Sequence, residues 1–277
     1  MESGLAVVPS RIPRRVRATV FGRDAATYDA ARLPYPRRVY EILVNRCNLR
    51  PGATVFEIGP GTGIATRELL RRGARPLTLI EPDRRLARYL RSSLGVDEER
   101  FRIEPSTFAR ARLSRGSFDL GVAASSFHWT RERPALRKVA RSLRPGGWWA
   151  MWNNHHGDPY RSSPFHQALQ PVYRKLYHGH VGGVYDRASA NAHRARRLAA
   201  LRGVDQFDRI KSEQIHWSAN LPTERVTALW GTFSDTQILP PRKRTWFLGE
   251  VSRIADEQFG SKVTLRMWTP IYTARKA

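Results

Sequence analysis

Short apolar runs alternate with amphipathic segments through the first half of the chain. Five of these runs have the length and composition of buried strands, at residues 54–58, 77–80, 101–104, 118–124 and 148–152. Between them apolar side chains recur at helical spacing, as in Leu136, Val139 and Leu143. Strands joined by helical crossovers form a parallel sheet with helices on both faces. The pattern therefore predicts a doubly wound α/β fold, with its ligand site at the carboxyl ends of the strands.

Changes in this pattern divide the chain into four segments. Residues 1–20 are basic and predict a flexible arm, and residues 21–153 hold the alternating core. Residues 154–205 are rich in His, Tyr, Gly and Arg and break the alternation, so we expect a helical lid insertion that covers the site. Residues 206–277 complete the core, with a strand near 209–217, helices from Pro222 and Pro240, and a last strand near 263–273.

A glycine-rich turn follows the first strand. Gly59, Gly61 and Gly63 have the spacing G-x-G-x-G, and Ile64 stands where a dinucleotide-binding turn has its third glycine. No Gly-Lys-Ser/Thr follows, which excludes a Walker phosphate loop. Glycines let the backbone approach a ligand closely, and the helix start that follows attracts anionic groups. The turn predicts a cofactor site, and its spacing disfavours NAD.

The stretch Glu57-Ile58-Gly59-Pro60-Gly61-Thr62-Gly63 resembles the first motif of class I S-adenosylmethionine-dependent methyltransferases. Glu81, which ends the second strand, resembles the second motif. The resemblance implies a Rossmann-like fold with a mostly parallel seven-stranded sheet. It also implies S-adenosyl-L-methionine as cofactor and S-adenosyl-L-homocysteine as product. In that family the first acid helps to fix the glycine turn and the cofactor's ammonium group, and the second holds the ribose hydroxyls.

Further stretches resemble a bacterial small-molecule subgroup, the type 11 methyltransferases. Residues 125–129 are similar to its A-x-H-W signature, and residues 28–36 are similar to its opening. The resemblance implies that Tyr28 and Arg32 close over the cofactor, with Arg32 able to pair with its carboxylate. The acid that many relatives carry after the third strand is absent, so we expect Thr107 and Phe108 to contact the adenine. The expected cofactor-binding residues are Tyr28, Arg32, Glu57, Gly59, Pro60, Gly61, Gly63, Glu81, Pro82, Thr107, Phe108, Ala123 and Ala124.

His128 has two interpretations. As a general base it would take a proton from the acceptor atom, since an imidazole titrates near neutrality. As a structural residue it would bond the backbone beside Trp129. A base is not compulsory, because holding the methyl group and the acceptor in line supplies most of the catalysis. The expected substrate-binding residues are Trp129, Asn153, Asn154 and His155.

Six histidines fall between residues 155 and 193: His155, His156, His166, His178, His180 and His193. They show no metal-ligand spacing, so we expect no metal site, and we expect some of them to line the substrate pocket.

The formal net charge of the chain is +24, and almost all of its basic residues are Arg. A partner rich in phosphate would explain this charge, and so would the codon bias of a GC-rich genome. The scatter of the arginines along the chain favours codon bias. One group would nevertheless suit an acidic substrate: Arg187, Arg194, Arg196, Arg197 and Arg202.

The location of the protein follows from weaker signals. Cys47 is the single cysteine, so no disulfide forms within the chain. No stretch is apolar over the roughly 18 residues that a membrane helix needs, and the start lacks the order of a secretory signal. We expect a cytoplasmic bacterial protein without a membrane partner.

The sequence therefore predicts an enzyme that transfers a methyl group from S-adenosylmethionine to O, N or C of a small molecule, in specialised metabolism. Two alternatives stay open. The net charge favours an RNA methyltransferase, although no RNA-binding module accompanies the core. The scaffold could also serve a non-catalytic basic binding protein. Specific recognition of nucleic acid is not expected, and the sequence does not determine the oligomeric state.

Overall fold

The computed structural model describes residue 22 and residues 24–95, 100–176 and 186–277. The basic arm predicted for residues 1–20 lies outside the described residues, and so do His178 and His180. The chain forms two compact units. We call the unit made of Pro34–Asn154, Ala188–Ile215 and Thr269–Ala277 the sheet unit. We call the unit made of the residues up to Leu33, His155–Arg187 and His216–Trp268 the helical unit.

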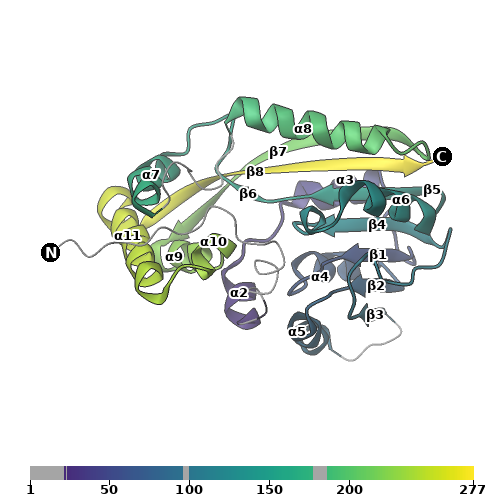
Figure 1. Cartoon of the computed structure of the whole chain (residues 1–277), viewed down its shortest axis with the longest axis horizontal. Coiled ribbons are helices and arrows are strands. Elements are labelled where there is room, and N and C mark those ends of the chain that lie inside the picture. The colour runs from purple at the N-terminus through teal and green to yellow at the C-terminus, as the bar shows by residue number, and fades with distance from the viewer. Residues whose placement is uncertain (1–21, 23, 96–99, 177–185) are drawn as a thin grey trace. The chain divides into compact units, whose positions relative to one another are not determined.

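Helices and strands alternate in the sheet unit, whereas the helical unit consists mainly of helices (Figure 1). The sheet unit contains α3 (Arg37–Asn45), β1 (Val55–Ile58), α4 (Ile64–Arg71), β2 (Leu77–Ile80), α5 (Arg84–Leu94), β3 (Phe101–Glu104), β4 (Phe118–Ala124), the 3-10 helix η1 (Phe127–Trp129), α6 (Glu132–Ser142), β5 (Leu143–Trp152) and nearly all of α8 (Arg187–Arg202). The helical unit contains α2 (Ala25–Ala31), β6 (His155–His156), α7 (Pro164–Leu176), α9 (Thr223–Gly231), α10 (Ser234–Gln237) and α11 (Pro241–Phe259). The strands β7 (Phe207–Pro222) and β8 (Lys262–Lys276) each contribute to both units.

The sheet confirms the predicted α/β class. Its order in the sheet unit is β3-β2-β1-β4-β5-β8. The first five of these strands run parallel, and β8 is antiparallel to β5. β1 pairs with β2 on one side and with β4 on the other, so the strand order reverses beside β1. Ligands of such sheets bind at this reversal, outside the carboxyl ends of the strands.

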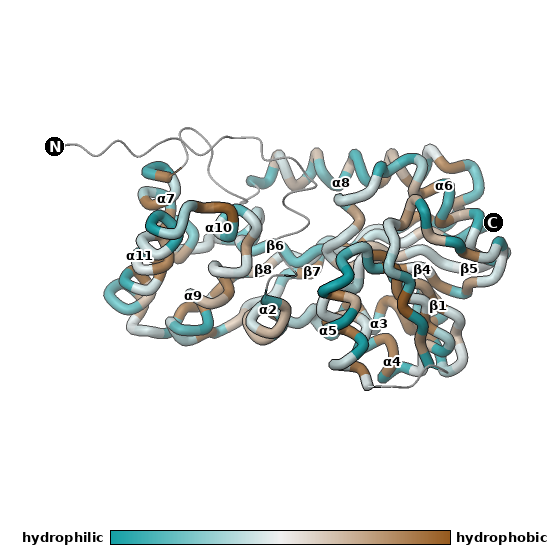
Figure 2. The backbone as a smooth tube through the Cα atoms, turned by 60° about the horizontal axis from the view of Figure 1, so that its bottom comes forward, coloured by the Kyte–Doolittle hydropathy of each residue, from teal (hydrophilic) through white to brown (hydrophobic). Residues whose placement is uncertain are grey.

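The strands β1 and β4 are mostly apolar because both lie in the core of the sheet unit. Every residue of both strands is buried, because helices cover both faces of a parallel sheet. The ring of Phe56 packs edge-on against Phe118 at 5.0 Å between centroids and stacks on Trp149 at 6.3 Å. A methyl group on Gly121 would lie 2.2 Å from the Phe56 ring, so the glycine makes room for the aromatic cluster. The alternation of hydrophilic and hydrophobic residues along α5 and α8 matches one buried face on each helix (Figure 2).

The helical unit has an apolar core of its own. Phe165 and Leu169 of α7, Trp230 of α9 and Phe247 of α11 are all buried within it. The predicted helix starts are confirmed to within one residue, since Pro222 and Pro240 are the N-caps of α9 and α11. Proline suits these positions because the first N–H groups of a helix need no intrahelical acceptor. Within the described residues, no helix is long and apolar enough to cross a membrane.

Two predicted features differ from the structure. In the described part of the chain the sheet has eight strands rather than seven, because the two residues of β6 pair with Trp268 and Met267 of β8. The segment 154–205, predicted as one insertion, is shared between the units. Its second half, α8, belongs to the sheet unit because Leu201 lies in the core that contains Phe56 and Trp149.

The space at Gly121 yields a test of this packing. Gly121→Ala would force the added methyl group into the Phe56 ring, so we expect the free energy of unfolding to fall by about 1–3 kcal/mol. Gly249→Ala is the matched control, because nothing lies within 4 Å of its added carbon. In the exposed interior of α11, this change is expected to stabilise the protein by about 0.5–1 kcal/mol. Urea unfolding measures both values, and equal effects of the two changes would contradict the packing.

Candidate functional site

The three glycines of the turn after β1 have different physical roles. All three adopt left-handed backbone, with φ of 63° at Gly59, 61° at Gly61 and 91° at Gly63. A side chain at Gly59 would meet Ser126 at 2.7 Å, and one at Gly63 would meet Leu90 at 2.6 Å. Nothing lies within 4 Å of the position that a side chain would take at Gly61. The outer two glycines thus let the turn pack closely, and the middle one borders open space.

Glu81 holds this turn from the end of β2. One carboxylate oxygen accepts a hydrogen bond from the N–H of Gly61 at 3.0 Å, and the other accepts one from the N–H of Asp83 at 3.0 Å. Asp83 in turn caps α5 by accepting from the N–H of Arg85 at 2.9 Å. Burial raises the pKa of Glu81 to about 7, although both backbone hydrogen bonds oppose the shift. Each oxygen keeps a second lone pair, so the carboxylate can still accept from a ligand.

Glu57 lies in the interior of β1 and is fully buried. Its Oε2 accepts a hydrogen bond from the hydroxyl of Thr66 at 2.7 Å. Its Oε1 is buried and has no hydrogen-bond partner among the described residues. Burial raises the pKa of Glu57 to about 7, the Thr66 hydrogen bond lowers it, and the charge of Glu81 raises it further. Its unsatisfied oxygen can accept one more donor.

The end of β4 is fastened to the glycine turn. The hydroxyl of Ser126 donates to the carbonyl of Ile58, and the N–H of Ser125 donates to the carbonyl of Trp152 at 2.8 Å. His128 follows on η1 and is exposed, with its ring 4.7 Å from the ring of Trp129 between centroids. The histidine and tryptophan of the signature therefore follow directly after a strand end that hydrogen bonds hold in place.

The other expected cofactor residues of the sheet unit differ in burial. Phe108 is buried in the core, with its ring stacked on Phe56 at 6.1 Å, a position that favours a packing role for the ring itself. Thr107 is exposed, and its carbonyl accepts from two backbone N–H groups of the following turn. Pro60, Ala123 and Ala124 are buried, and Pro82 is exposed.

The residues that follow β5 form contacts within the protein that the sequence does not suggest. The side-chain amide of Asn154 donates to the carbonyl of Pro34 at 3.2 Å and accepts from the hydroxyl of Thr269 at 2.7 Å. It therefore ties the start of the sheet unit to β8. Asn153 is half-buried beside it. His155 belongs to the helical unit, where its ring stacks on Trp268 at 4.8 Å.

Tyr28 and Arg32 lie on and beside α2 of the helical unit. The guanidinium of Arg32 lies over the ring of Tyr28 at 4.8 Å and over the ring of Phe233 at 5.1 Å. One of its N–H groups donates to the carbonyl of Thr232 at 3.4 Å, and its Nε is buried without a partner among the described residues. The contacts of both residues with a cofactor stay a prediction.

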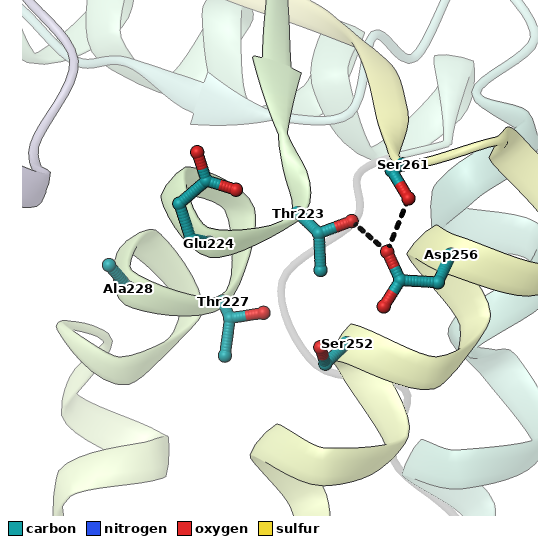
Figure 3. Close-up of a pocket in the computed structure, with 7 residues that line it drawn as sticks. All are labelled: Thr223, Glu224, Thr227, Ala228, Ser252, Asp256 and Ser261. Atoms are coloured by element: carbon teal, nitrogen blue, oxygen red, sulfur yellow. Dashed lines mark hydrogen bonds between the residues drawn. The ribbon is translucent and has the colours of Figure 1, made fainter.

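A polar hollow opens between α9 and the end of α11 (Figure 3). Asp256 accepts hydrogen bonds from Thr223 at 2.5 Å and from Ser261 at 2.7 Å. These bonds lower the pKa of Asp256, and they connect the first residues of α9 and the turn before β8 to α11. The side chains of the hollow thus serve the fold. In the described part of the chain, no cluster of three or more His, Cys, Asp or Glu is arranged to hold a metal.

Sequence reasoning missed the residues that support the motif. Thr66 and Ser126 form the hydrogen bonds that hold Glu57 and the turn, and Leu90 fills the space against Gly63. Thr66 lies nine residues after Glu57, on the first turn of α4, where the helix that follows the glycine turn begins. Ser126 and Leu90 come from other crossovers, and no local pattern marks them.

This geometry can be compared with known proteins. Residues 56–151 match the model of a family described as a methyltransferase domain. Residues 56–151, which hold the glycine turn and Glu81, are therefore similar to a methyltransferase domain. An uncharacterized methyltransferase of Schizosaccharomyces pombe is 29% identical over 140 residues, which is 48% of this chain and 52% of that protein. The chain thus matches about half the length of that relative.

Solved structures show the same fold around the methyltransferase domain. A protein described as a methyltransferase from an antibiotic biosynthesis pathway of Anabaena variabilis superposes with a TM-score of 0.60 at 14% identity, over 88% of this chain and 98% of that one. Phosphoethanolamine N-methyltransferase 2 of Haemonchus contortus, in complex with phosphomonomethylethanolamine and S-adenosylhomocysteine, superposes with a TM-score of 0.55 at 12% identity. That match covers 97% of this chain and 61% of that one.

The burial of Glu57 yields a test by pH. Its folded-state pKa of about 7 lies above its ordinary 4.5, so ionisation destabilises the folded state fully above pH 7 and not at all below pH 4.5. Glu57→Gln keeps an acceptor for Thr66 and removes the charge. We expect it to raise the free energy of unfolding near pH 8 by on the order of 2 kcal/mol and to leave it unchanged near pH 4.

Urea titrations at the two pH values measure this difference. The control is Glu257→Gln on α11, where an exposed carboxylate pairs with Arg253 at 2.6 Å. Such a surface pair contributes less than about 1 kcal/mol at either pH. A gain at Glu57 that is equal at both pH values would show that the carboxylate is not destabilised by burial.

Proposed function

We propose that the chain transfers a methyl group from S-adenosylmethionine to a small-molecule acceptor. The observation that carries the proposal is the open space at Gly61, beside the Glu81 carboxylate and between two glycines that are packed against side chains. The match to a methyltransferase domain supports it. So does the S-adenosylhomocysteine bound to the nematode enzyme that shares the fold.

The residues at the turn fit the proposed cofactor. The carboxylate of Glu81 has acceptor capacity for two ribose hydroxyls, and the orphaned Oε1 of Glu57 can accept from an ammonium group. The N-terminal end of α4, with its positive dipole end, follows the turn and suits the carboxylate. When bound, the cofactor supplies an activated methyl group on a sulfonium.

The protein's own contribution to the proposed reaction is positioning. Holding the acceptor atom in line with the methyl group removes most of the entropic barrier. His128, exposed after β4, is proposed as the group that takes a proton from an acceptor that must lose one. An acceptor that is already ionised, or an amine in its free-base form, would not need it.

The second candidate is an RNA methyltransferase, favoured by the net charge of +24. On α5, Arg84, Arg88 and Arg91 are exposed and recur along one side of the helix. Such a row can bind phosphates without reading sequence. Methylation of bulk RNA, with no turnover of any metabolite in a broad panel, would favour this candidate over the first.

Binding of S-adenosylhomocysteine by calorimetry tests the cofactor site. We expect micromolar affinity for the wild type, no binding by Gly61→Arg, and a loss of tenfold or more in Glu81→Ala. Gly52→Arg is the matched control, since Gly52 also has left-handed backbone (φ of 80°) and open space around it, but lies before β1. It should bind like the wild type. A folded wild type that does not bind would overturn the proposed function.

The affinity should also depend on pH. Ribose hydroxyls donate to an ionised carboxylate, and the pKa of Glu81 is raised to about 7 by burial. Affinity for S-adenosylhomocysteine is therefore expected to fall as the pH drops through 7, by up to about tenfold per unit. In Glu81→Gln, which cannot ionise, the pH dependence should be smaller than in the wild type. Equal profiles in the two proteins would remove Glu81 from the site.

A further inference from the structure

The core of the helical unit contains polar side chains that an apolar core does not need. His156 of β6, His166 of α7 and Arg32 lie among the rings of Trp230 and Phe233; we call these five residues the histidine cluster. The ring of His156 is 4.7 Å from Phe233 and 6.2 Å from Trp230, and the ring of His166 is 5.5 Å from Trp230. Arg32 lies 5.1 Å above the ring of Phe233. All five residues belong to one compact unit, so their neighbourhood is set within it.

Five polar atoms of this cluster are buried and lack hydrogen-bond partners among the described residues. Both ring nitrogens of His156, both ring nitrogens of His166 and the Nε of Arg32 have no hydrogen-bond partner among the described residues. His166 is only 5% exposed. No carboxylate of the described chain forms an ion pair with Arg32, whose one hydrogen bond goes to the carbonyl of Thr232. By contrast, the indole N–H of Trp230 in the same core donates to the hydroxyl of Tyr173 at 2.9 Å.

Such an arrangement is unfavourable unless another molecule completes it. A buried polar group without a hydrogen bond destabilises a fold by about 1–3 kcal/mol. Native cores contain few such groups, and each one calls for an explanation, such as a bound water, an ion or a chemical role. Five unpartnered atoms on three neighbouring side chains form a set of donors and acceptors that are held ready for a ligand.

The chemistry of the cluster defines that ligand. Burial lowers the pKa of His156 well below its ordinary value, and the nearby charge of Arg32 adds to the shift. Burial also lowers the pKa of His166 to about 4. Both rings are therefore neutral at pH 7, and each offers one donor and one acceptor, which suits a hydroxyl group. Arg32 supplies the one positive charge of the cluster, which suits a carboxylate, and the rings of Trp230 and Phe233 suit an aromatic body.

We propose that the histidine cluster binds a small aromatic acid that carries a hydroxyl group. His156 and His166 hold the hydroxyl group, and Arg32 holds the carboxylate. The site differs from the expected substrate residues Trp129 and Asn153, which belong to the sheet unit.

Calorimetry on the full chain with 4-hydroxybenzoate tests the site. The uncharged 4-hydroxybenzamide serves as the matched ligand. We expect the wild type to bind the acid at least tenfold more tightly than the amide, and Arg32→Gln to lose that preference. His156→Phe and His166→Phe should each weaken binding of the acid at least tenfold. They should also raise Tm by about 2–4 °C, because each removes unpartnered polar atoms from the core. The exposed Arg242→Gln of α11 is the control for attraction by the overall charge, and it should bind both ligands like the wild type.

The outcomes separate this proposal from the proposed function. If S-adenosylhomocysteine binds and the acid does not, the histidine cluster is no such site, while the cofactor proposal stands. If Arg32→Gln weakens S-adenosylhomocysteine and keeps the preference for the acid, Arg32 does not hold the ligand carboxylate.

Discussion

The hydrogen bond from the N–H of Gly61 to the carboxylate of Glu81 joins two crossovers of the sheet, and the candidate cofactor site depends on it. Glu81 reaches the glycine turn only because β1 and β2 run parallel and end together, with Ile58 opposite Ile80. This turn passes close to the end of β4 only because Gly59 has no side chain to meet Ser126. Parallel register, a left-handed turn and a buried acid are thus parts of a single constraint.

That constraint is achieved against an electrostatic penalty. Glu57 and Glu81 are both buried near one another, and burial raises the pKa of each to about 7. Core positions that served packing alone would be filled by apolar side chains at lower free energy. A carboxylate within β1 and another directly after β2 are therefore best explained by the groups that they can receive, and the unpartnered oxygen of Glu57 is consistent with this.

The helical unit shows the same principle in an aromatic setting. Aromatic rings surround His156 and His166. Both ring nitrogens of each histidine and the Nε of Arg32 are buried without hydrogen-bond partners in the described chain. In each unit the unfavourable burial of polar groups identifies the position at which chemistry is expected.

The sequence by itself determined the α/β fold and the turn that carries the cofactor motif. Alternation of apolar runs and helical periodicity depends on local geometry. Positive φ at Gly59, Gly61 and Gly63 is equally local, because only glycine adopts it without strain. The starts of α9 and α11 could be predicted from their prolines, because the preference of proline for a helix start is also local.

Tertiary structure alone decided which side chains meet. Phe108, expected beside the adenine, is buried with its ring stacked on Phe56. Asn154, expected at a substrate, is occupied by Pro34 and Thr269, which lie more than a hundred residues away in sequence. Arg32, His156 and Phe233 come together from three distant segments. Leu201 packs in the core of the sheet unit, so α8 belongs to that unit. Contacts of this kind depend on how helices pack over strands, and no periodicity along the chain encodes them.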